Sequence, residues 1–98
     1  MKLVWTRLAQ EDRRAIREYI AGDNPRAALA MDALVSEKAA RLVSLPEMGK
    51  PGRVLETREL VIHRSYILIY AIKSDQVQVL RVLHTARRWP PTGKGPSS

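Results

Sequence analysis

Cysteine is absent from the 98 residues, and histidine occurs only twice. Without thiols the chain can form no disulfide and no thiolate metal site, and two separated histidines do not make a zinc site by themselves. We therefore expect no metal and no cofactor. The absence of cysteine leaves the redox compartment open.

Long apolar segments are also missing. The longest apolar run, 66–72, is far shorter than the roughly 20 residues needed to span a bilayer. The start of the chain, 1–7, lacks the apolar region of a signal peptide. We expect a cytoplasmic protein without a membrane segment. Its length predicts one domain with a modest core.

Acidic residues are scarce in the second half of the chain. The whole sequence has 17 Lys and Arg against 10 Asp and Glu, a net charge of +7. Residues 50–98 contain 9 of the basic and 3 of the acidic residues, so +6 of the +7 lies there. Such a surface is typical of a protein that meets a polyanion, either nucleic acid or an acidic protein. The alternative is a solvated basic surface without a partner.

Two helices are predicted before this basic half. Thr6 suits the N-cap of a helix over about 7–21, and Asn24 followed by Pro25 starts a second helix over about 25–43. The short link between them predicts an antiparallel helical hairpin. The apolar face expected for the first helix consists of Leu8, Ala9, Ile16, Tyr19 and Ile20. The stripe expected for the second consists of Ala28, Met31, Leu34, Val35, Ala39 and Leu42.

The strands are expected on either side of the helices. One covers 2–6, another about 55–64, and a hairpin of two more ends at His84. This order predicts an α+β fold: an N-terminal strand, the antiparallel helical hairpin, then a three-stranded antiparallel sheet with the helices on one face. The domain should cover 1–90, with 91–98 as a disordered tail.

Basic side chains gather around the last strand. An unpaired Arg under the helices would be costly, so Arg81 should point to the open face of the sheet. A metal-independent ribonuclease needs a proton acceptor, a proton donor and cations around the phosphate. Candidates for these roles are Arg58, Arg64, Arg81, His84 and Arg87. The competing interpretation is structural, with His84 as a hydrogen-bonding residue at a strand end and the arginines as solvated side chains.

Six motifs are spread along the chain: Tyr-Ile at 19–20, Asp-Asn-Pro at 23–25, and the segments 45–49, 57–61, 66–70 and 79–87. Together they resemble the RelE/ParE superfamily of bacterial type II toxin–antitoxin toxins, over roughly residues 1–90. The resemblance implies the same fold and an acidic antitoxin that wraps and neutralises the toxin. It makes four residues candidates for contact with the target or the antitoxin: Arg81, Arg87, Arg88 and Trp89. Trp89 is alternatively an apolar clip for the sheet edge.

The superfamily contains two activities. RelE-type members cut messenger RNA on the ribosome, and ParE-type members poison DNA gyrase. Of the basic positions that the RelE-type pattern implies, Arg58 and Arg87 are present, whereas Leu60 and Ile67 replace two others and no Tyr follows Tyr70.

The long helical hairpin is more similar to the ParE type. We therefore predict a toxin of a plasmid-stabilising type that poisons gyrase and is not an enzyme. The alternative is a ribosome-dependent endoribonuclease, an mRNA interferase with Arg58, Arg64, His84 and Arg87 as catalytic residues. A third possibility is an inactive relic that binds antitoxin only.

Overall fold

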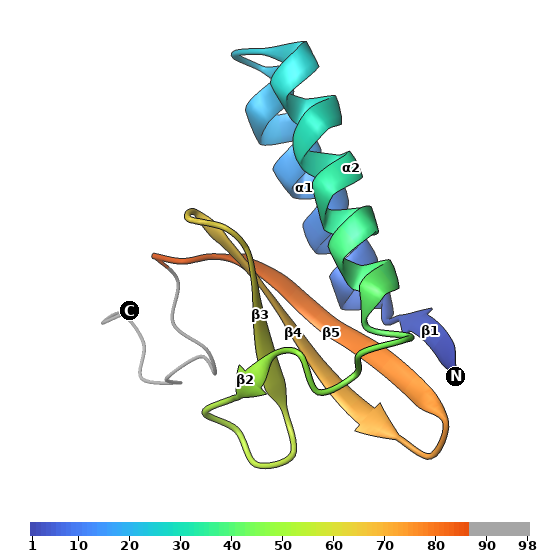
Figure 1. Ribbon diagram of the computed structural model, residues 1–98. Helices are drawn as coiled ribbons and strands as arrows, with labels where there is room; N and C mark the ends of the chain where they lie inside the picture. The colour runs from blue at the N-terminus through green and yellow to red at the C-terminus, as the bar shows by residue number, and fades with distance from the viewer. Residues whose placement is uncertain (87–98) are drawn as a thin grey trace.

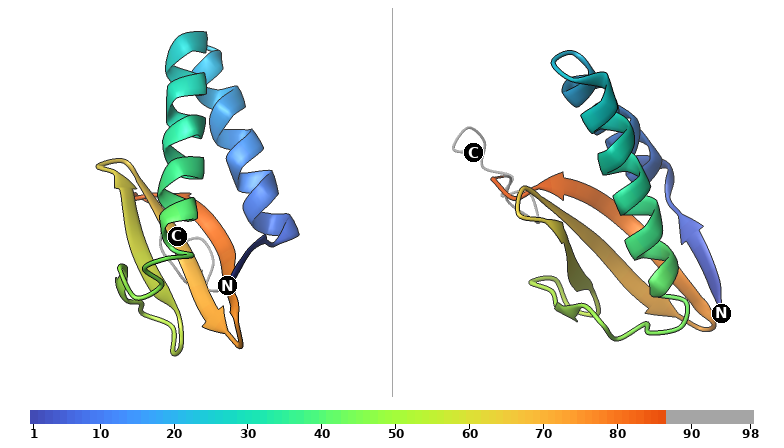
Figure 2. Two further views of the ribbon diagram at one scale, coloured as in Figure 1. Left: turned by 45° about the vertical axis from the view of Figure 1, so that its right-hand side comes forward. Right: turned by 45° about the horizontal axis from the view of Figure 1, so that its top comes forward.

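A computed structural model describes residues 1–86 as a helical hairpin and a five-stranded sheet (Figure 1). The elements are β1 (Lys2–Trp5), α1 (Arg7–Ala21), α2 (Pro25–Arg41), β2 (Lys50–Pro51), β3 (Arg58–His63), β4 (Tyr66–Lys73) and β5 (Gln76–His84). Both helices lie on one face of the sheet, and their far ends project beyond it (Figure 2). The α+β fold expected from the sequence is confirmed. Within 1–86, neither helix combines the length and apolar character that crossing a membrane requires.

The sheet is mixed rather than wholly antiparallel. Its strand order is β1-β5-β4-β3-β2, and the predicted antiparallel hairpins β3–β4 and β4–β5 are present. Two pairings were missed: β1 runs parallel to β5, with Leu3 opposite Val77, and the two-residue β2 pairs with β3. A short apolar strand carries no local signal for its partner. β2 lies in a loop whose Pro and Gly residues are atypical of strands.

The strand predicted over 55–64 begins later, at Arg58. The residues before it form a turn in which Gly52 N–H donates to Thr57 O at 2.8 Å. Glu56 in this turn has a φ of 68°, a left-handed conformation that interrupts an extended strand. The turn projects Leu55, which is 86% exposed.

Helix α1 has the predicted boundaries. The Thr6 hydroxyl accepts the Ala9 N–H at 3.1 Å, which satisfies one of the free donors at the start of the helix. The predicted apolar face is correct for Ala9, Ile16 and Ile20, which are buried or half-buried. It is wrong for Leu8 and Tyr19, which are mostly exposed. Helical periodicity places Ala9, Ile16 and Ile20 on the face toward the core, and Leu8 and Tyr19 are each one residue off that face.

Helix α2 begins at Pro25 as predicted, with the Asn24 side chain accepting the Ala27 N–H at 3.1 Å. It ends at Arg41, two residues earlier than expected. The predicted stripe faces the sheet and the first helix: Ala28, Val35, Ala39 and Leu42 are buried, and Met31 and Leu34 are partly buried.

Asp32 of α2 ties the two helices together. Its Oδ1 lies 3.0 Å from Nη2 of Arg13 and 3.2 Å from Nη1 of Arg17, both on α1. The Arg13 guanidinium also lies over the Trp5 ring, 4.5 Å from its centroid, a cation–π contact. This cluster of Asp32, Arg13, Arg17 and Trp5 joins α1, α2 and β1.

The core lies between the helices and one face of the sheet. Val35 and Ala39 of α2, the C-cap residue Leu42 and Ala9 of α1 belong to the same buried cluster as alternate residues of the sheet. The sheet contributes Leu60, Ile62, Tyr66, Leu68, Tyr70, Val77, Val79 and Val82. This alternation fixes which side chains face the helices and which face away.

Candidate functional site

Arg58, a candidate cation for phosphate, stands at the start of β3 opposite Tyr70. Its Nη1 donates to Gly49 O at 2.6 Å and to Glu47 O at 3.3 Å. The guanidinium is therefore used to hold the 45–49 loop against the sheet. Backbone carbonyls carry no sequence signal, so this role was not predictable from residue types.

Tyr70 also binds the 45–49 loop, through its hydroxyl group. Its side chain is fully buried, and its hydroxyl donates to Pro46 O at 2.7 Å and accepts the Gly49 N–H at 2.9 Å. Burial raises the pKa of Tyr70 above its ordinary value, and the hydrogen bond from Gly49 opposes the increase. A Cβ on Gly49 would lie 2.8 Å from Tyr70 atoms and from Glu59 O, so this position requires glycine.

Arg64 and His84 lie at the other end of the sheet. Arg64 is exposed in the β3–β4 turn, and its carbonyl accepts the Thr85 hydroxyl at 3.3 Å. His84 ends β5, accepts the Ala86 N–H on Nδ1 at 3.0 Å, and packs its ring edge-on to Tyr66 with centroids 5.2 Å apart. The structure therefore brings the β3–β4 turn and the end of β5 together.

The sequence-predicted ribonuclease residues do not form one cluster. Arg58 is opposite Tyr70, and His84 is opposite Tyr66. These tyrosines are four residues apart on β4, a separation of about 13 Å along a strand. Because Arg58 Nη1 is bonded to the 45–49 loop, the structure does not place Arg58 beside His84. Arg87, the fourth candidate, lies outside the described residues, as do Arg88 and Trp89.

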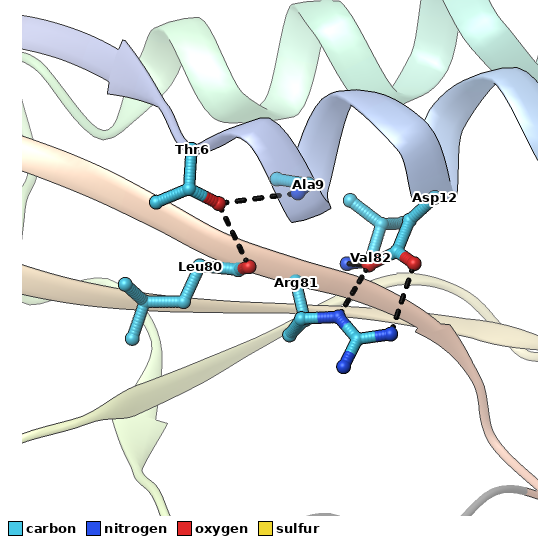
Figure 3. A network of polar contacts seen from close by, with 6 residues as sticks. All are labelled: Thr6, Ala9, Asp12, Leu80, Arg81 and Val82. Atoms are coloured by element: carbon cyan, nitrogen blue, oxygen red, sulfur yellow. Dashed lines mark hydrogen bonds and ion pairs between the residues drawn. The ribbon is translucent and has the colours of Figure 1, made fainter.

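Arg81, expected on the open face of the sheet and as a contact for the target or the antitoxin, is paired with a side chain of α1. Its Nε donates to Asp12 Oδ2 at 2.7 Å and its Nη2 to Asp12 Oδ1 at 3.0 Å, and Oδ2 also accepts the Val82 N–H at 2.9 Å (Figure 3). The hydrogen bond to Asp12 is the main cause that raises the pKa of Arg81.

Asp12 belongs to a pair of contacts that fasten α1 to the edge of β5. Thr6, one turn and a half earlier, donates its hydroxyl to Leu80 O at 3.0 Å (Figure 3). β1 no longer pairs with β5 at this point, so the side chains of Thr6 and Asp12 form hydrogen bonds with the free backbone groups of β5, the Leu80 carbonyl and the Val82 N–H. The register shifts at Ile69 and Tyr70, where β5 carries the extra residue Leu80.

A groove of about 350 Å³ separates α1 from the His84 end of the sheet. It is lined by Asp12, Ala15, Ile16, Tyr19, Tyr66, Val82, Leu83 and His84. Burial raises the pKa of Tyr66, and Tyr19 adds to the increase. This groove was not predicted from the sequence, although residues 12, 15, 16 and 19 are spaced to lie on one side of a helix.

A metal site needs several side chains that bind one ion together. No group of three or more His, Asp or Glu side chains within 1–86 is placed to hold a metal ion. The site that the geometry does present is an apolar groove with a basic sheet end beside it.

Comparisons with known proteins agree on one family. Residues 3–89 match the family described as ParE toxin of type II toxin–antitoxin system, parDE. The protein Y4kP of Sinorhizobium fredii is 37% identical over 90 residues, covering 91% of this chain and 93% of its own. Toxin RelE2 of Caulobacter vibrioides is 35% identical over 86 residues, covering 88% and 97%.

Solved structures show the same architecture. A chain from the chromosomal ParDE system of P. aeruginosa has a TM-score of 0.76 at 30% identity, covering 86% of this chain and 95% of its own. The isolated E. coli RelE toxin has a TM-score of 0.62 at 15% identity, covering 90% and 87%, which supports the fold alone.

Proposed function

The chain belongs to the ParE toxin family of type II toxin–antitoxin systems, and from this premise we propose that it poisons DNA gyrase and does not cut RNA. One observation carries the proposal: the basic residues that a ribonuclease would need are divided between two ends of the sheet. Arg58 is bound to the 45–49 loop, and Arg64 and His84 lie about 13 Å away along the strand direction.

The chemistry of RNA cleavage explains why this division matters. Stabilising a pentacoordinate phosphate requires cations within hydrogen-bond distance of the same oxygens, in place before the reaction. Both bonds of Arg58 come from Nη1, so only its Nε and Nη2 donors are left for a phosphate, and the loop restricts where they can point. Ile67, at the strand position where the RelE-type pattern implies an arginine, supplies no cation.

The antitoxin partner fits the groove between α1 and the sheet. Most of the groove's walls are apolar, with Ala15, Ile16, Val82 and Leu83 among its residues. The chain carries a net charge of +7, so an acidic segment with apolar side chains is the complementary ligand. Arg87 and Arg88 contact this partner or the target. Action on gyrase would place the toxin in the cytoplasm.

Gyrase supercoiling is the direct test. Purified toxin added to gyrase, ATP and relaxed plasmid should reduce supercoiling or leave linear, protein-linked DNA, and pre-mixing with antitoxin should abolish the effect. A heat-denatured sample of the same toxin is the matched control. Normal supercoiling at a large excess of folded toxin would contradict the proposal.

The second candidate function is ribosome-dependent cleavage of messenger RNA. The observation in its favour is that Arg64 and His84 lie at the same end of the sheet, where the Thr85 hydroxyl bonds to the Arg64 carbonyl. Under this alternative, Arg64, His84 and Arg87 would act in place of the catalytic residues that the RelE-type pattern implies. Primer extension on transcripts after toxin induction would reveal codon-positioned cuts under this alternative and none under gyrase poisoning.

A further inference from the structure

The 45–49 loop carries apolar side chains that the fold does not bury. It belongs to the segment that runs from the end of α2 to β2 (Figure 1). Leu45 is 58% exposed and Met48 is 40% exposed. An open hollow of about 460 Å³ is lined by five consecutive residues, Ser44, Leu45, Pro46, Glu47 and Met48. Two apolar side chains beside one hollow are a more specific feature than the single exposed apolar residues that are common on protein surfaces.

The backbone of this loop is fixed by side chains of the sheet. Tyr70 and Arg58 bond to three of its carbonyls, and the Tyr70 hydroxyl also accepts one of its N–H groups. Within the loop, Met48 N–H donates to Leu45 O at 3.0 Å. Because these bonds are present before any partner binds, covering the two apolar side chains would cost little conformational entropy.

The charge of this surface differs from that of the chain as a whole. The chain has a net charge of +7, but the only charged residue among 44–48 is Glu47, which is exposed. A nucleic acid needs several cations on the surface that it contacts, so it does not suit the loop. The Glu47 carboxylate would also repel the acidic segment proposed for the groove. The complementary partner is an apolar cleft on a folded protein, with a Lys or Arg at the rim of the cleft.

The loop and the groove beside α1 lie at different ends of β4. Tyr66 lines the groove, whereas Tyr70 bonds to the loop. These tyrosines are four residues apart, about 13 Å along a strand. A ligand confined to the groove therefore does not cover the loop.

We propose that the 45–49 loop docks on the protein target of the toxin. Leu45 and Met48 enter an apolar cleft of that protein, and Glu47 faces a Lys or Arg at the rim. The inference rests on the proposed action on gyrase, and it assigns this contact to the protein and not to DNA. The toxin then has two surfaces with different partners, the groove for antitoxin and the loop for the target.

The double substitution Leu45→Ala, Met48→Ala tests the docking surface. The toxin concentration that halves gyrase supercoiling should rise about tenfold or more, because a few anchor residues dominate binding at an interface. The affinity for antitoxin, measured by calorimetry, should stay the same, which also shows that the variant is folded. Leu29→Ala, at a leucine of α2 that is 69% exposed, is the matched control and should inhibit gyrase like the parent. Unchanged inhibition by the double variant would overturn the proposal.

Charge reversal gives a second readout. Glu47→Lys should weaken inhibition of gyrase several-fold, because it places a cation opposite the basic rim, and added salt should restore part of the loss. Glu18→Lys, at an exposed position of α1, makes the same change in net charge and should inhibit like the parent. If the double variant lost affinity for antitoxin instead, the loop would be an antitoxin contact and the proposal would be wrong.

Growth arrest separates this inference from the proposed function. If the parent toxin left supercoiling unchanged, gyrase would not be the target and the proposed function would fail. Colony counts after induction would then decide the role of the loop. Loss of arrest in the double variant, with Leu29→Ala still toxic, would support docking on whichever protein the toxin does act on. Arrest as strong as that of the parent would overturn the inference for any target.

Discussion

Asp12 and Arg81 form a two-pronged ion pair that bonds the second turn of α1 to the edge of β5, with N–O distances of 2.7 and 3.0 Å. The same carboxylate accepts the Val82 N–H, so a single side chain serves one guanidinium and one backbone donor. The Asp12 and Arg81 side chains are only 14% and 20% exposed. Solvent can therefore replace these bonds only in part.

Replacing Asp12 with Ala should lower the free energy of unfolding by about 2–3 kcal/mol, because it leaves Arg81 and the Val82 N–H without their partner. Urea denaturation monitored by circular dichroism measures the loss. Glu11→Ala, which removes the exposed pair with Arg7, is the control and should cost no more than about 0.5 kcal/mol. Equal losses for the two variants would show that the Asp12 pair has no special role.

Tyr70→Phe should lower the free energy of unfolding by about 2 kcal/mol, because the Gly49 N–H and the Pro46 carbonyl both lose a buried partner. Chemical denaturation at neutral pH gives the value, and proteolysis of the 45–49 loop should accelerate. Tyr19→Phe, at an exposed position, is the control and should behave like the parent. An unchanged loop in Tyr70→Phe would contradict the role assigned to the hydroxyl.

The pH dependence of the free energy of unfolding above about pH 10 should also report on Tyr70. Burial raises the pKa of Tyr70 above 10.0, its ordinary value, so the unfolded chain ionises first as pH rises. Stability should be constant below about pH 10 and fall as pH passes through the higher folded pKa. Tyr66, whose pKa is also raised, contributes in the same direction. Tyr70→Phe should therefore reduce this fall in part, which denaturation at a series of pH values will show.

Local and long-range features differ in how well the sequence predicts them. Thr6 and Asn24 mark the helix starts correctly because a capping side chain and its N–H partner lie three residues apart. Asp12 and Arg81 are 69 positions apart, and nothing near either residue identifies the other. The pairing of β1 with β5 was not predicted for the same reason, because the two strands lie far apart in the sequence.

The candidate site shows this limit most clearly. Residue types correctly marked Arg58 as a cation but could not show that backbone carbonyls of the 45–49 loop would occupy it. The groove was missed because its two walls come from residues 12–19 and 66–84, which only the fold brings together.

Asp32→Ala should loosen the helical hairpin, because Arg13 and Arg17 lose their shared carboxylate. We expect a loss of about 1–2 kcal/mol, since the group is partly buried and the bonds are charge-assisted. Hydrogen exchange should speed up in the far turns of both helices while β3 and β4 stay protected. Glu37→Ala, which breaks the exposed pair with Arg41, provides the comparison. Uniform acceleration across the whole chain would indicate global destabilisation instead.

The double substitution Arg64→Ala, His84→Ala should leave growth arrest intact if the toxin poisons gyrase by binding. Both side chains are exposed, so the variant should fold normally. Colony counts after induction in cells lacking antitoxin measure the effect, with immunoblotting to confirm equal amounts of protein. Loss of toxicity together with normal circular dichroism would favour the ribonuclease alternative.

The parallel pairing of β1 with β5 also sets when the toxin can form. β1 and α1 are synthesised before their partners at 76–82. Until β5 has been synthesised, the first strand and the first helix therefore lack the strand that they pack against, because contacts of long sequence separation form late. A fragment that ends before β5 would have no closed sheet, so it should not fold as this domain does.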